Sequence, residues 1–352
     1  MKAWVLKDLD RIVLEDRERP SAGEHEVLVK VSAAGVCGSD IPRIYRTGAY
    51  HYPLIPGHEF SGVVEELGSG AEKDWLHKRV GIFPLIPCRE CAPCRKKQYE
   101  MCRNYSYLGS RRDGGFAEYA AVPVENLLLL PNEVSEEAAA MLEPMAVAVH
   151  AVRRVSLSTE DSVVVCGLGT IGLLVLMFLL EMGLRNIFVV GNKEFQRQMA
   201  EELGIPGSHY CDKNRQDAGE WILAQTKGLG ADVFFECVGK NETVVQAVNA
   251  ARPGGRIVLV GNPYSDMLLG KAVYWKVLRN QLTVTGTWNS SFTHSMEDDW
   301  HYALERVRRG TVVPQQLITH RLAMDELEKG LLIMRDKKED YGKIMVNMCP
   351  AQ

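Results

Sequence analysis

The sequence lacks three features, and each absence narrows what the protein can do. There is no excess of positive charge: the 352 residues carry a formal net charge of −4, which argues against nucleic acid or an anionic membrane as a main partner. The first residues have no apolar core of the secretory kind, so we expect a cytoplasmic protein. The uncharged run at 163–180 contains three glycines and opens with three valines, which favours a buried strand, a turn and a helix over a membrane span.

Nine cysteines occur in this chain without an evident leader. Thiols in a reducing compartment are more often metal ligands than disulfides. Four of them follow the spacing C-x2-C-x2-C-x7-C, namely Cys88, Cys91, Cys94 and Cys102. Four thiolates this close can surround one Zn²⁺ tetrahedrally, so the spacing predicts a structural zinc in a lobe at 88–102. An iron–sulfur cluster is the rival interpretation, and the acidic net charge disfavours a nucleic-acid-binding zinc ribbon.

A length of 352 residues suggests two domains, and the hydrophobic pattern changes along the chain accordingly. In the first third, short β-type runs such as 27–31, 62–67 and 79–83 predict a mostly β, barrel-like module. Ser135 then has the features of a helix N-cap, and the helix is expected to continue to about residue 150.

From residue 161 onward, strands and helices alternate as far as a strand at 282–286. This alternation predicts right-handed βαβ crossovers and a parallel sheet with helices on both faces. We therefore expect an α/β fold in which a Rossmann-type, doubly wound domain at 154–291 is inserted into a catalytic domain. The catalytic domain would comprise 1–153, with the cysteine lobe, and 292–352.

The glycine motif GxGxxG occurs once in the expected context, as Gly167-Leu168-Gly169-Thr170-Ile171-Gly172 between a predicted strand and a predicted helix. In such a turn the glycines permit the bend, the approach of a pyrophosphate and close packing of helix on strand, and the helix N-terminus favours the phosphate charge. We expect Gly167, Gly169, Thr170, Ile171 and Gly172 to bind a nicotinamide dinucleotide. The alternative is a packing turn without a ligand.

The residue that usually selects NAD is missing from the second strand of this domain. An acidic residue about 20 positions after the motif normally binds the ribose 2′-hydroxyl, but Gly191 occupies that position here. Asn192, Lys193 and Arg197 follow it, and the two basic side chains would favour the 2′-phosphate of NADP. The alternative is that both are solvated helix residues and that NAD binds without its usual anchor.

A second group of potential metal ligands is dispersed in the first domain. Cys37 lies in a Cys-Gly-Ser-Asp loop, His58 follows in Gly-His-Glu, and Glu143 lies near the helix before the nucleotide domain. Cysteine, histidine and a carboxylate are the ligands of a catalytic zinc with one open position. Singly, each could be an ordinary core or helix residue, but they occur together with a cysteine site and a nucleotide motif.

The order of these motifs resembles that of the zinc-containing medium-chain alcohol dehydrogenase/reductase family, over essentially the whole chain. Within it, residues 37–44, 57–62 and 109–119 resemble the galactitol-1-phosphate 5-dehydrogenase subfamily, with sorbitol dehydrogenases more distant. The resemblance implies a GroES-like barrel for the catalytic domain and two zinc ions, one catalytic and one structural. Cys37, His58, Glu59 and Glu143 would lie in or near the catalytic zinc shell, with the direct ligand among the two glutamates left open.

The resemblance also implies the chemistry. Ser39 would pass the proton of the substrate hydroxyl toward solvent, and a hydride would move between the substrate carbon and NAD or NADP. A phosphorylated polyol would need cationic anchors, and the candidates, all of which could equally be surface residues, are Arg43, Arg46, Arg111 and Arg112.

Several alternatives stay open at this point. The substrate could be a free polyol, threonine or another secondary alcohol, and a non-catalytic zinc-binding protein is the remote possibility. The strand at 282–286 could lie at a sheet edge, which is usually paired or covered, and the family resemblance then implies a homodimer or a homotetramer.

Overall fold

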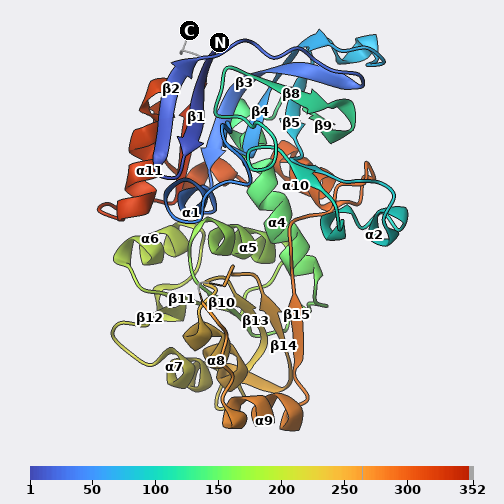
Figure 1. Cartoon of the computed structure of the whole chain (residues 1–352). Coiled ribbons are helices and arrows are strands. Elements are labelled where there is room, and N and C mark those ends of the chain that lie inside the picture. The colour runs from blue at the N-terminus through green and yellow to red at the C-terminus, as the bar shows by residue number, and fades with distance from the viewer. Residues whose placement is uncertain (264, 349–352) are drawn as a thin grey trace. The chain divides into compact units, whose positions relative to one another are not determined.

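The computed structural model describes residues 1–263 and 265–348. Its contacts divide the chain into two compact units, which Figure 1 shows by residue number. The first unit comprises Met1–Ala146 and Ser290–Gln352, and the second comprises Val147–Asn289. The predicted combination of a doubly wound parallel sheet and a mostly β domain is confirmed by the sheets of these units. The domain limits expected from the sequence, at residues 153/154 and 291/292, remain a prediction.

The first unit is organised around a seven-stranded sheet of order β16-β17-β3-β4-β5-β9, in which β8 also pairs with β3. All its pairings are antiparallel except that of β16 with β17. Two small sheets, β1-β2 and β6-β7, complete the strands. The strands are β1 (Lys2–Asp8), β2 (Arg11–Asp16), β3 (Glu26–Val36), β4 (Glu59–Leu67), β5 (Arg79–Ile82), β6 (Leu85–Ile86), β7 (Ser106–Tyr107), β8 (Tyr119–Pro123), β9 (Leu127–Leu129), β16 (Ile318–Ala323) and β17 (Lys343–Asn347).

The helices of this unit are short and surround the sheet. They are α1 (Asp40–Tyr45), α2 (Ala92–Arg95), α3 (Glu136–Ala140), α10 (Asp299–Arg308) and α11 (Leu327–Asp336), with 3₁₀ turns at Lys73–Trp75, Tyr99–Met101, Val124–Asn126, Pro314–Leu317 and Met324–Glu326. A further helix, α4 (Leu142–Arg153), begins in this unit and ends in the second. Strand residues of alternating burial supply the core, which includes Val27, Val29, Val31 and Phe60 from β3 and β4.

The second unit contains a six-stranded, all-parallel sheet of order β12-β11-β10-β13-β14-β15. This order, with the first strand in the middle, is that of a dinucleotide-binding sheet, and it places the point where the strand order reverses beside β10. Its elements are β10 (Val163–Cys166), α5 (Thr170–Glu181), β11 (Ile187–Gly191), α6 (Glu194–Glu202), a 3₁₀ turn (Gly207–His209), β12 (Tyr210–Asp212), α7 (Ala218–Gln225), β13 (Ala231–Glu236), α8 (Asn241–Ala250), β14 (Ala251–Leu259), α9 (Lys271–Arg279) and β15 (Thr283–Gly286).

The uncharged run at 163–180 is explained by this unit. Val163, Val164 and Val165 of β10 are fully buried, and α5 buries most of its residues, so the run lies inside the sheet and its covering helix. No helix among residues 1–263 and 265–348 is both long enough and apolar enough to cross a membrane.

The helix expected from Ser135 to about residue 150 is instead two helices. The Ser135 side chain accepts a hydrogen bond from the backbone N–H of Ala138 and caps α3, as predicted. The break at Met141 follows from Pro144, which has no N–H to donate to the carbonyl of Ala140 and so interrupts the helical hydrogen bonds. The break places Glu143 in the first turn of α4.

Candidate metal centre and cofactor site

Three potential metal ligands of the first unit come together in the structure. The Cys37 thiol, the His58 imidazole and the Glu59 carboxylate each offer a ligand atom, and these atoms lie within 4.8 Å of one another. Cys37 follows β3, while His58 and Glu59 lie at the start of β4, which pairs antiparallel with β3. Sulfur, imidazole nitrogen and carboxylate oxygen form a donor set that suits zinc with one position open.

The cluster has space for Glu59 because residue 35 has no side chain. Gly35 is the partner of Glu59 in the register of β3 and β4. A Cβ at residue 35 would lie 2.3 Å from Glu59 Oε2 and 2.7 Å from Lys343 Cε. Any larger residue would therefore displace both side chains, and the glycine is a requirement of the site.

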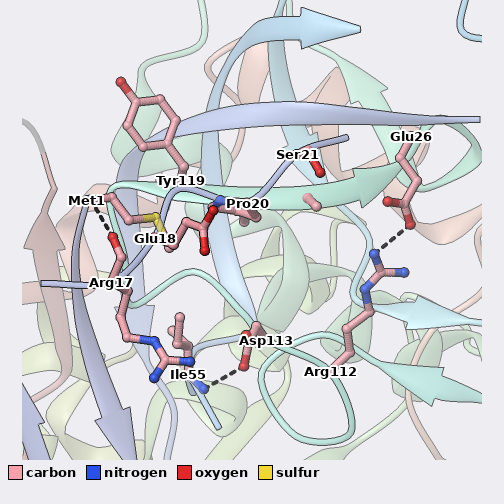
Figure 2. Close-up of a pocket in the computed structure, with 12 residues that line it drawn as sticks. Met1, Arg17, Glu18, Pro20, Ser21, Glu26, Ile55, Arg112, Asp113 and Tyr119 are labelled. Atoms are coloured by element: carbon pink, nitrogen blue, oxygen red, sulfur yellow. Dashed lines mark hydrogen bonds and ion pairs between the residues drawn. The ribbon is translucent and has the colours of Figure 1, made fainter. Parts of the chain in front are cut away.

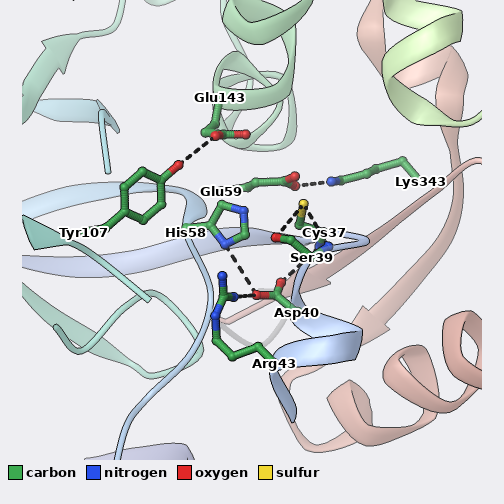
Figure 3. A network of polar contacts seen from close by, with 9 residues as sticks. All are labelled: Cys37, Ser39, Asp40, Arg43, His58, Glu59, Tyr107, Glu143 and Lys343. Atoms are coloured by element: carbon green, nitrogen blue, oxygen red, sulfur yellow. Dashed lines mark hydrogen bonds and ion pairs between the residues drawn. The ribbon is translucent and has the colours of Figure 1, made fainter. Parts of the chain in front are cut away.

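Asp40 orients His58 from behind. The Asp40 side chain is fully buried, its Oδ1 lies 3.4 Å from His58 Nδ1, and it also accepts a hydrogen bond of 2.6 Å from Arg43 Nη1. The Nδ1 contact is an ion-pair distance without good hydrogen-bond geometry. Figure 3 shows the other ring nitrogen of His58 pointing toward Glu59. The imidazole therefore offers Nε2 to the cluster, the orientation that a carboxylate behind a metal-binding histidine fixes.

His58 and Asp40 each favour the charged form of the other. Burial by itself lowers the pKa of His58, but the Asp40 carboxylate and the Cys37 thiol outweigh it and raise the pKa well above its ordinary value. Burial likewise opposes ionisation of Asp40, but the His58 ring and the Arg43 guanidinium lower the pKa of that carboxyl below its usual range. Asp40 is therefore negatively charged in the folded protein, and it stabilises positive charge on the His58 ring.

Lys343 neutralises Glu59 in a buried ion pair. Lys343 Nζ contacts Glu59 Oε2, and both side chains are only 2% exposed (Figure 3). Lys343 is the first residue of β17, which pairs antiparallel with β3. A buried charge without a partner is strongly destabilising, so each of these residues requires either the other or a further charge nearby.

Glu143 lies close to the cluster but outside the group of three. Its carboxylate accepts a hydrogen bond of 3.1 Å from the Tyr107 hydroxyl (Figure 3). The Tyr107 ring in turn lies 5.8 Å from the His58 ring, centroid to centroid. Burial raises the pKa of Glu143 to about 7, with the nearby Glu59 carboxylate adding to the shift.

Ser39 is the N-cap residue of α1 and lies beside Cys37. Its hydroxyl donates a hydrogen bond to Cys37 Sγ at 3.3 Å, and its backbone N–H lies 3.5 Å from the same sulfur. Both Ser39 donors therefore lie beside the Cys37 sulfur, the atom that would bind a metal ion. The same hydroxyl oxygen can accept a proton from a group bound beside the sulfur.

The four cysteines of the 88–102 lobe also converge. Their sulfur atoms all lie within 4.8 Å of one another, with separations of 3.4 Å for Cys91–Cys94, 3.9 Å for Cys91–Cys102 and 4.0 Å for Cys88–Cys94. A disulfide would need about 2.05 Å, whereas a tetrahedral Zn²⁺ with Zn–S bonds of about 2.3 Å holds its sulfurs about 3.8 Å apart. The geometry therefore suits a four-coordinate metal ion and excludes disulfides among these residues.

The lobe also has the electrostatics of a cation site. Backbone N–H groups of Arg103 and Cys94 lower the pKa of Cys91 to about 6, whereas burial beside the other thiols raises the pKa of Cys94 to about 12. Several thiolates cannot share this space without a positive charge between them, and a divalent ion supplies it.

The glycine motif of the second unit forms the expected turn between β10 and α5. Gly167 has a φ of +94°, which few other residues adopt. A Cβ at Gly172 would lie 1.9 Å from Gly167 O, so helix and strand approach too closely for a side chain there. A Cβ at Gly169 would meet no atom within 4 Å, and this residue is the N-cap of α5. The backbone at the start of the helix is therefore open to an anion.

At the end of β11, the structure explains the missing acidic residue. A Cβ at Gly191 would lie 2.6 Å from the Tyr210 hydroxyl and 2.8 Å from Gln196 Oε1. Asn192 and Lys193 follow at the start of α6, where Lys193 O accepts a hydrogen bond from the Tyr210 hydroxyl. Arg197 instead forms ion pairs on its own helix, at 2.9 Å with Glu201 and 3.8 Å with Glu194.

Three residues of the metal cluster were not predicted from the sequence. In the sequence, Asp40 is only part of the loop after Cys37. Its position three residues after that potential ligand was the one feature that could have indicated a role in the site. Tyr107 and Lys343 carried no signal, because their roles depend on strand pairings between distant segments.

Comparisons with known proteins agree with this geometry. Residues 23–132 match the family model described as "Alcohol dehydrogenase GroES-like domain", and residues 170–309 match the model described as "Zinc-binding dehydrogenase". Galactitol 1-phosphate 5-dehydrogenase of Escherichia coli (strain K12) is 33% identical over 88% of this chain and 88% of its own length. L-idonate 5-dehydrogenase of Vitis vinifera is 32% identical over 93% and 88%, and sorbitol dehydrogenase of Arabidopsis thaliana is 30% identical over 93% and 89%.

Solved structures give the same result. The crystal structure of galactitol-1-phosphate dehydrogenase from Escherichia coli matches with a TM-score of 0.92 at 30% identity, over 99% of this chain and 100% of that one. A putative zinc-binding dehydrogenase from Sinorhizobium meliloti 1021 bound to NADP matches with a TM-score of 0.89 at 27% identity, over 99% of both chains. A dehydrogenase from Escherichia coli CFT073 complexed with NADH matches with a TM-score of 0.90 at 26% identity, also over 99% of both.

Proposed function

Since the chain belongs to the family of zinc-binding, NAD(P)-dependent alcohol dehydrogenases, we propose that it transfers a hydride between NAD(P) and a secondary hydroxyl or ketone of a polyol phosphate. The observation that carries the proposal is the convergence of Cys37, His58 and Glu59 in one buried cluster. The similarity to galactitol 1-phosphate 5-dehydrogenase supports a phosphorylated substrate.

In this proposal the chain holds two zinc ions. Cys37, His58 and Glu59 would hold the catalytic ion, and Glu143, held by Tyr107, would face it from outside the group of three. The structural ion would be held by the four cysteines of the lobe, Cys88, Cys91, Cys94 and Cys102. A zinc ion in the first site supplies a Lewis acid that lowers the pKa of a substrate hydroxyl, and the nicotinamide is the hydride carrier.

The side chains around the catalytic cluster then have distinct tasks. Ser39 Oγ would take up the proton of the substrate hydroxyl and pass it toward solvent, since it lies 3.3 Å from Cys37 Sγ and is half-buried. Asp40 fixes the His58 ring, and Lys343 restrains the Glu59 carboxylate. Preorganised ligands of this kind keep the geometry of the site constant through the reaction.

A direct test compares two histidine variants in the purified protein. We expect wild type to contain about two equivalents of zinc per chain by elemental analysis, as the two ligand sets require. His58→Asn should lower the content to about one equivalent and abolish turnover, because an imidazole ligand is lost. His77→Asn changes an exposed histidine of the same unit and should keep both. Full turnover by the His58 variant would refute the proposed site.

The substrate class is tested by assaying matched pairs. Galactitol 1-phosphate and free galactitol differ only in the phosphate, and sorbitol, L-idonate and L-threonine represent the substrates named for other relatives. A free polyol is the second candidate, because sorbitol and L-idonate dehydrogenases match over nearly the same length. We expect the highest kcat/KM with the phosphorylated member. A preference for the free polyol would assign the second candidate instead.

We also propose that NADP is preferred over NAD, with the glycine turn Gly167, Gly169, Thr170, Ile171 and Gly172 as the pyrophosphate site. The support is at the end of β11, where Gly191 stands in place of an acidic residue and Asn192, Lys193 and Arg197 follow. Lys193→Ala should then reduce the ratio of kcat/KM for NADP to that for NAD by about 10-fold, since a charge-assisted hydrogen bond is lost. Lys271→Ala, an exposed lysine of the same unit, should leave the ratio unchanged. An unchanged ratio in both would refute the role of Lys193.

A homodimer, or a tetramer of dimers, is the assembly we propose. Within the described residues, β15 pairs with β14 alone and ends the six-stranded sheet. Val284 on it is 45% exposed, and Trp275 and Trp288 nearby in sequence are 56% and 55% exposed. An open edge with apolar neighbours is usually covered by a partner. Light scattering should give twice or four times the chain mass, and Val284→Lys should reduce it to that of a monomer. A monomeric wild type would refute the assembly.

A further inference from the structure

Four arginines near the cluster could bind a substrate phosphate, and the structure distinguishes them by their partners. Arg43 is committed to the buried Asp40 carboxylate at 2.6 Å. Arg112 pairs with Glu26 at 2.5 Å and lines a pocket of about 290 Å³ that also contains Glu18 and Asp113, as Figure 2 shows. Three carboxylates and two guanidinium groups line this pocket, and Arg112 already pairs with one of these carboxylates. Arg46 is exposed.

Arg111 differs from Arg43 and Arg112 because no carboxylate of the described chain pairs with it, and from Arg46 because its guanidinium is held between aromatic rings. Its guanidinium lies between two aromatic rings, 4.4 Å from the centroid of Tyr50 and 4.3 Å from that of Tyr105. Its Nη1 donates to Tyr105 O at 3.0 Å and its Nη2 to the Tyr50 hydroxyl at 3.3 Å. Stacking and these two hydrogen bonds hold the side chain in one place without neutralising its charge.

Three of the five N–H donors of this guanidinium have no acceptor among the described residues. Two are satisfied by the contacts with Tyr50 and Tyr105, and the buried Nε of Arg111 has no acceptor. The group is only partly buried, and Tyr50 above it is 70% exposed, so an anion can reach the terminal nitrogens from solvent. A fixed guanidinium with unused donors and no counter-ion is suited to bidentate recognition of a phosphate.

A continuous row of rings connects Arg111 to the metal cluster. Tyr105, on which Arg111 stacks, lies 6.2 Å from Tyr107, and Tyr107 lies 5.8 Å from His58, centroid to centroid. Tyr107 also contacts Glu143. Ring contacts therefore run from the Arg111 guanidinium to His58, one of the three residues of the cluster.

We propose that Arg111, clamped between Tyr50 and Tyr105, binds the phosphate of a polyol phosphate whose reacting hydroxyl lies at Cys37 and His58. This inference rests on the proposed function and deepens it, because it names the residue that discriminates a phosphorylated polyol from a free one. Arg112, its neighbour in sequence, has a structural role through Glu26.

The test measures kcat and KM for galactitol 1-phosphate and for galactitol in four proteins: wild type, Arg111→Gln, Arg111→Lys and Arg46→Gln. Loss of a bidentate, charge-assisted contact should lower kcat/KM for the phosphorylated substrate about 10- to 100-fold in Arg111→Gln, mainly through KM. The value for galactitol should stay within about 3-fold. Arg111→Lys keeps the charge without the fork and should be intermediate, and Arg46→Gln removes a charge nearby in sequence and should change neither substrate.

Calorimetric titration of galactitol 1-phosphate into each protein without nicotinamide cofactor gives a second readout that needs no turnover. We expect binding by wild type and Arg46→Gln, and a dissociation constant raised about 10- to 100-fold in Arg111→Gln. Equal losses with both substrates would show that Arg111 only supports the fold, and an effect confined to Arg46→Gln would place the phosphate elsewhere. Either result overturns the inference while the dehydrogenase activity stands. Absent turnover with intact, Arg111-dependent binding would instead refute the proposed function alone.

Discussion

Replacing Lys343 by methionine tests whether the buried pair with Glu59 stabilises the first unit. The two side chains are each 2% exposed, so removing the lysine leaves a carboxylate without a charge partner in the protein interior. Such a loss costs about 3–5 kcal/mol of the free energy of unfolding. Because zinc is itself a positive charge at Glu59 in the proposed function, the penalty should be largest in zinc-free protein and smaller when zinc is present.

The measurement is urea denaturation of four proteins, each with and without zinc: wild type, Lys343→Met, Glu59→Gln and the double variant. The double variant has no orphan charge, so it should recover about 2 kcal/mol or more relative to additive losses. Lys338→Met is the control, because that side chain is 83% exposed and should shift stability by less than about 0.5 kcal/mol. A loss below about 1 kcal/mol for Lys343→Met, or strict additivity in the double variant, would refute the reasoning.

Three further predictions concern other parts of the chain. Cys94→Ser should lower bound zinc by about one equivalent and reduce Tm, because one of four converging sulfurs is lost; unchanged metal content would contradict a metal in the lobe. Asp232→Asn should destabilise the protein by about 1–2 kcal/mol at pH 7, because the carboxylate accepts two hydrogen bonds from Ser162 and pairs with Arg252 at 2.6 Å. Burial opposes ionisation, but these partners keep the pKa of Asp232 below its ordinary value. The stability difference between wild type and Asp232→Asn should therefore be present above about pH 4 and vanish as the pH falls through the folded-state pKa. A pH-independent difference in urea midpoints between the two proteins would disprove this. Gly172→Val should abolish NADP and NAD binding or prevent folding of the second unit, measured by fluorescence titration and circular dichroism, because even a Cβ would lie 1.9 Å from a backbone oxygen; cofactor binding at wild-type affinity would exclude the described turn.

The sequence predicted the features that depend on nearby residues. The four cysteines lie within a lobe of 15 residues, and in a loop this short their sulfur atoms are necessarily near one another. The alternation of strands and helices after residue 161 likewise specified the parallel sheet, since each βαβ unit has one favoured hand. Short elements were missed, among them β12 and α9, because a three-residue strand and an exposed helix carry weak hydrophobic patterns.

The sequence could not rank residues whose roles depend on long-range pairing. The sequence does not distinguish Arg111 from Arg112, because they are adjacent residues of the same type. Only the fold pairs Arg112 with Glu26 and packs Arg111 between two tyrosine rings. Glu59 and Glu143 were equally good ligands in the sequence, whereas the structure groups Glu59 with Cys37 and His58. Contacts across more than a few dozen residues arise from strand register, which local patterns specify poorly.

The discontinuous first unit has a consequence for how the protein is made. Glu59 and the lysine that neutralises it are 284 positions apart, and β17, which carries that lysine, is the last strand among the described residues. While the middle of the chain is being translated, the strands of the second unit can pair, but the cluster of Cys37, His58 and Glu59 still lacks Lys343 and the strand that carries it. If this cluster holds the zinc ion of the proposed function, metal should therefore be acquired there only after β17 has been made, whereas the cysteine lobe can be loaded earlier.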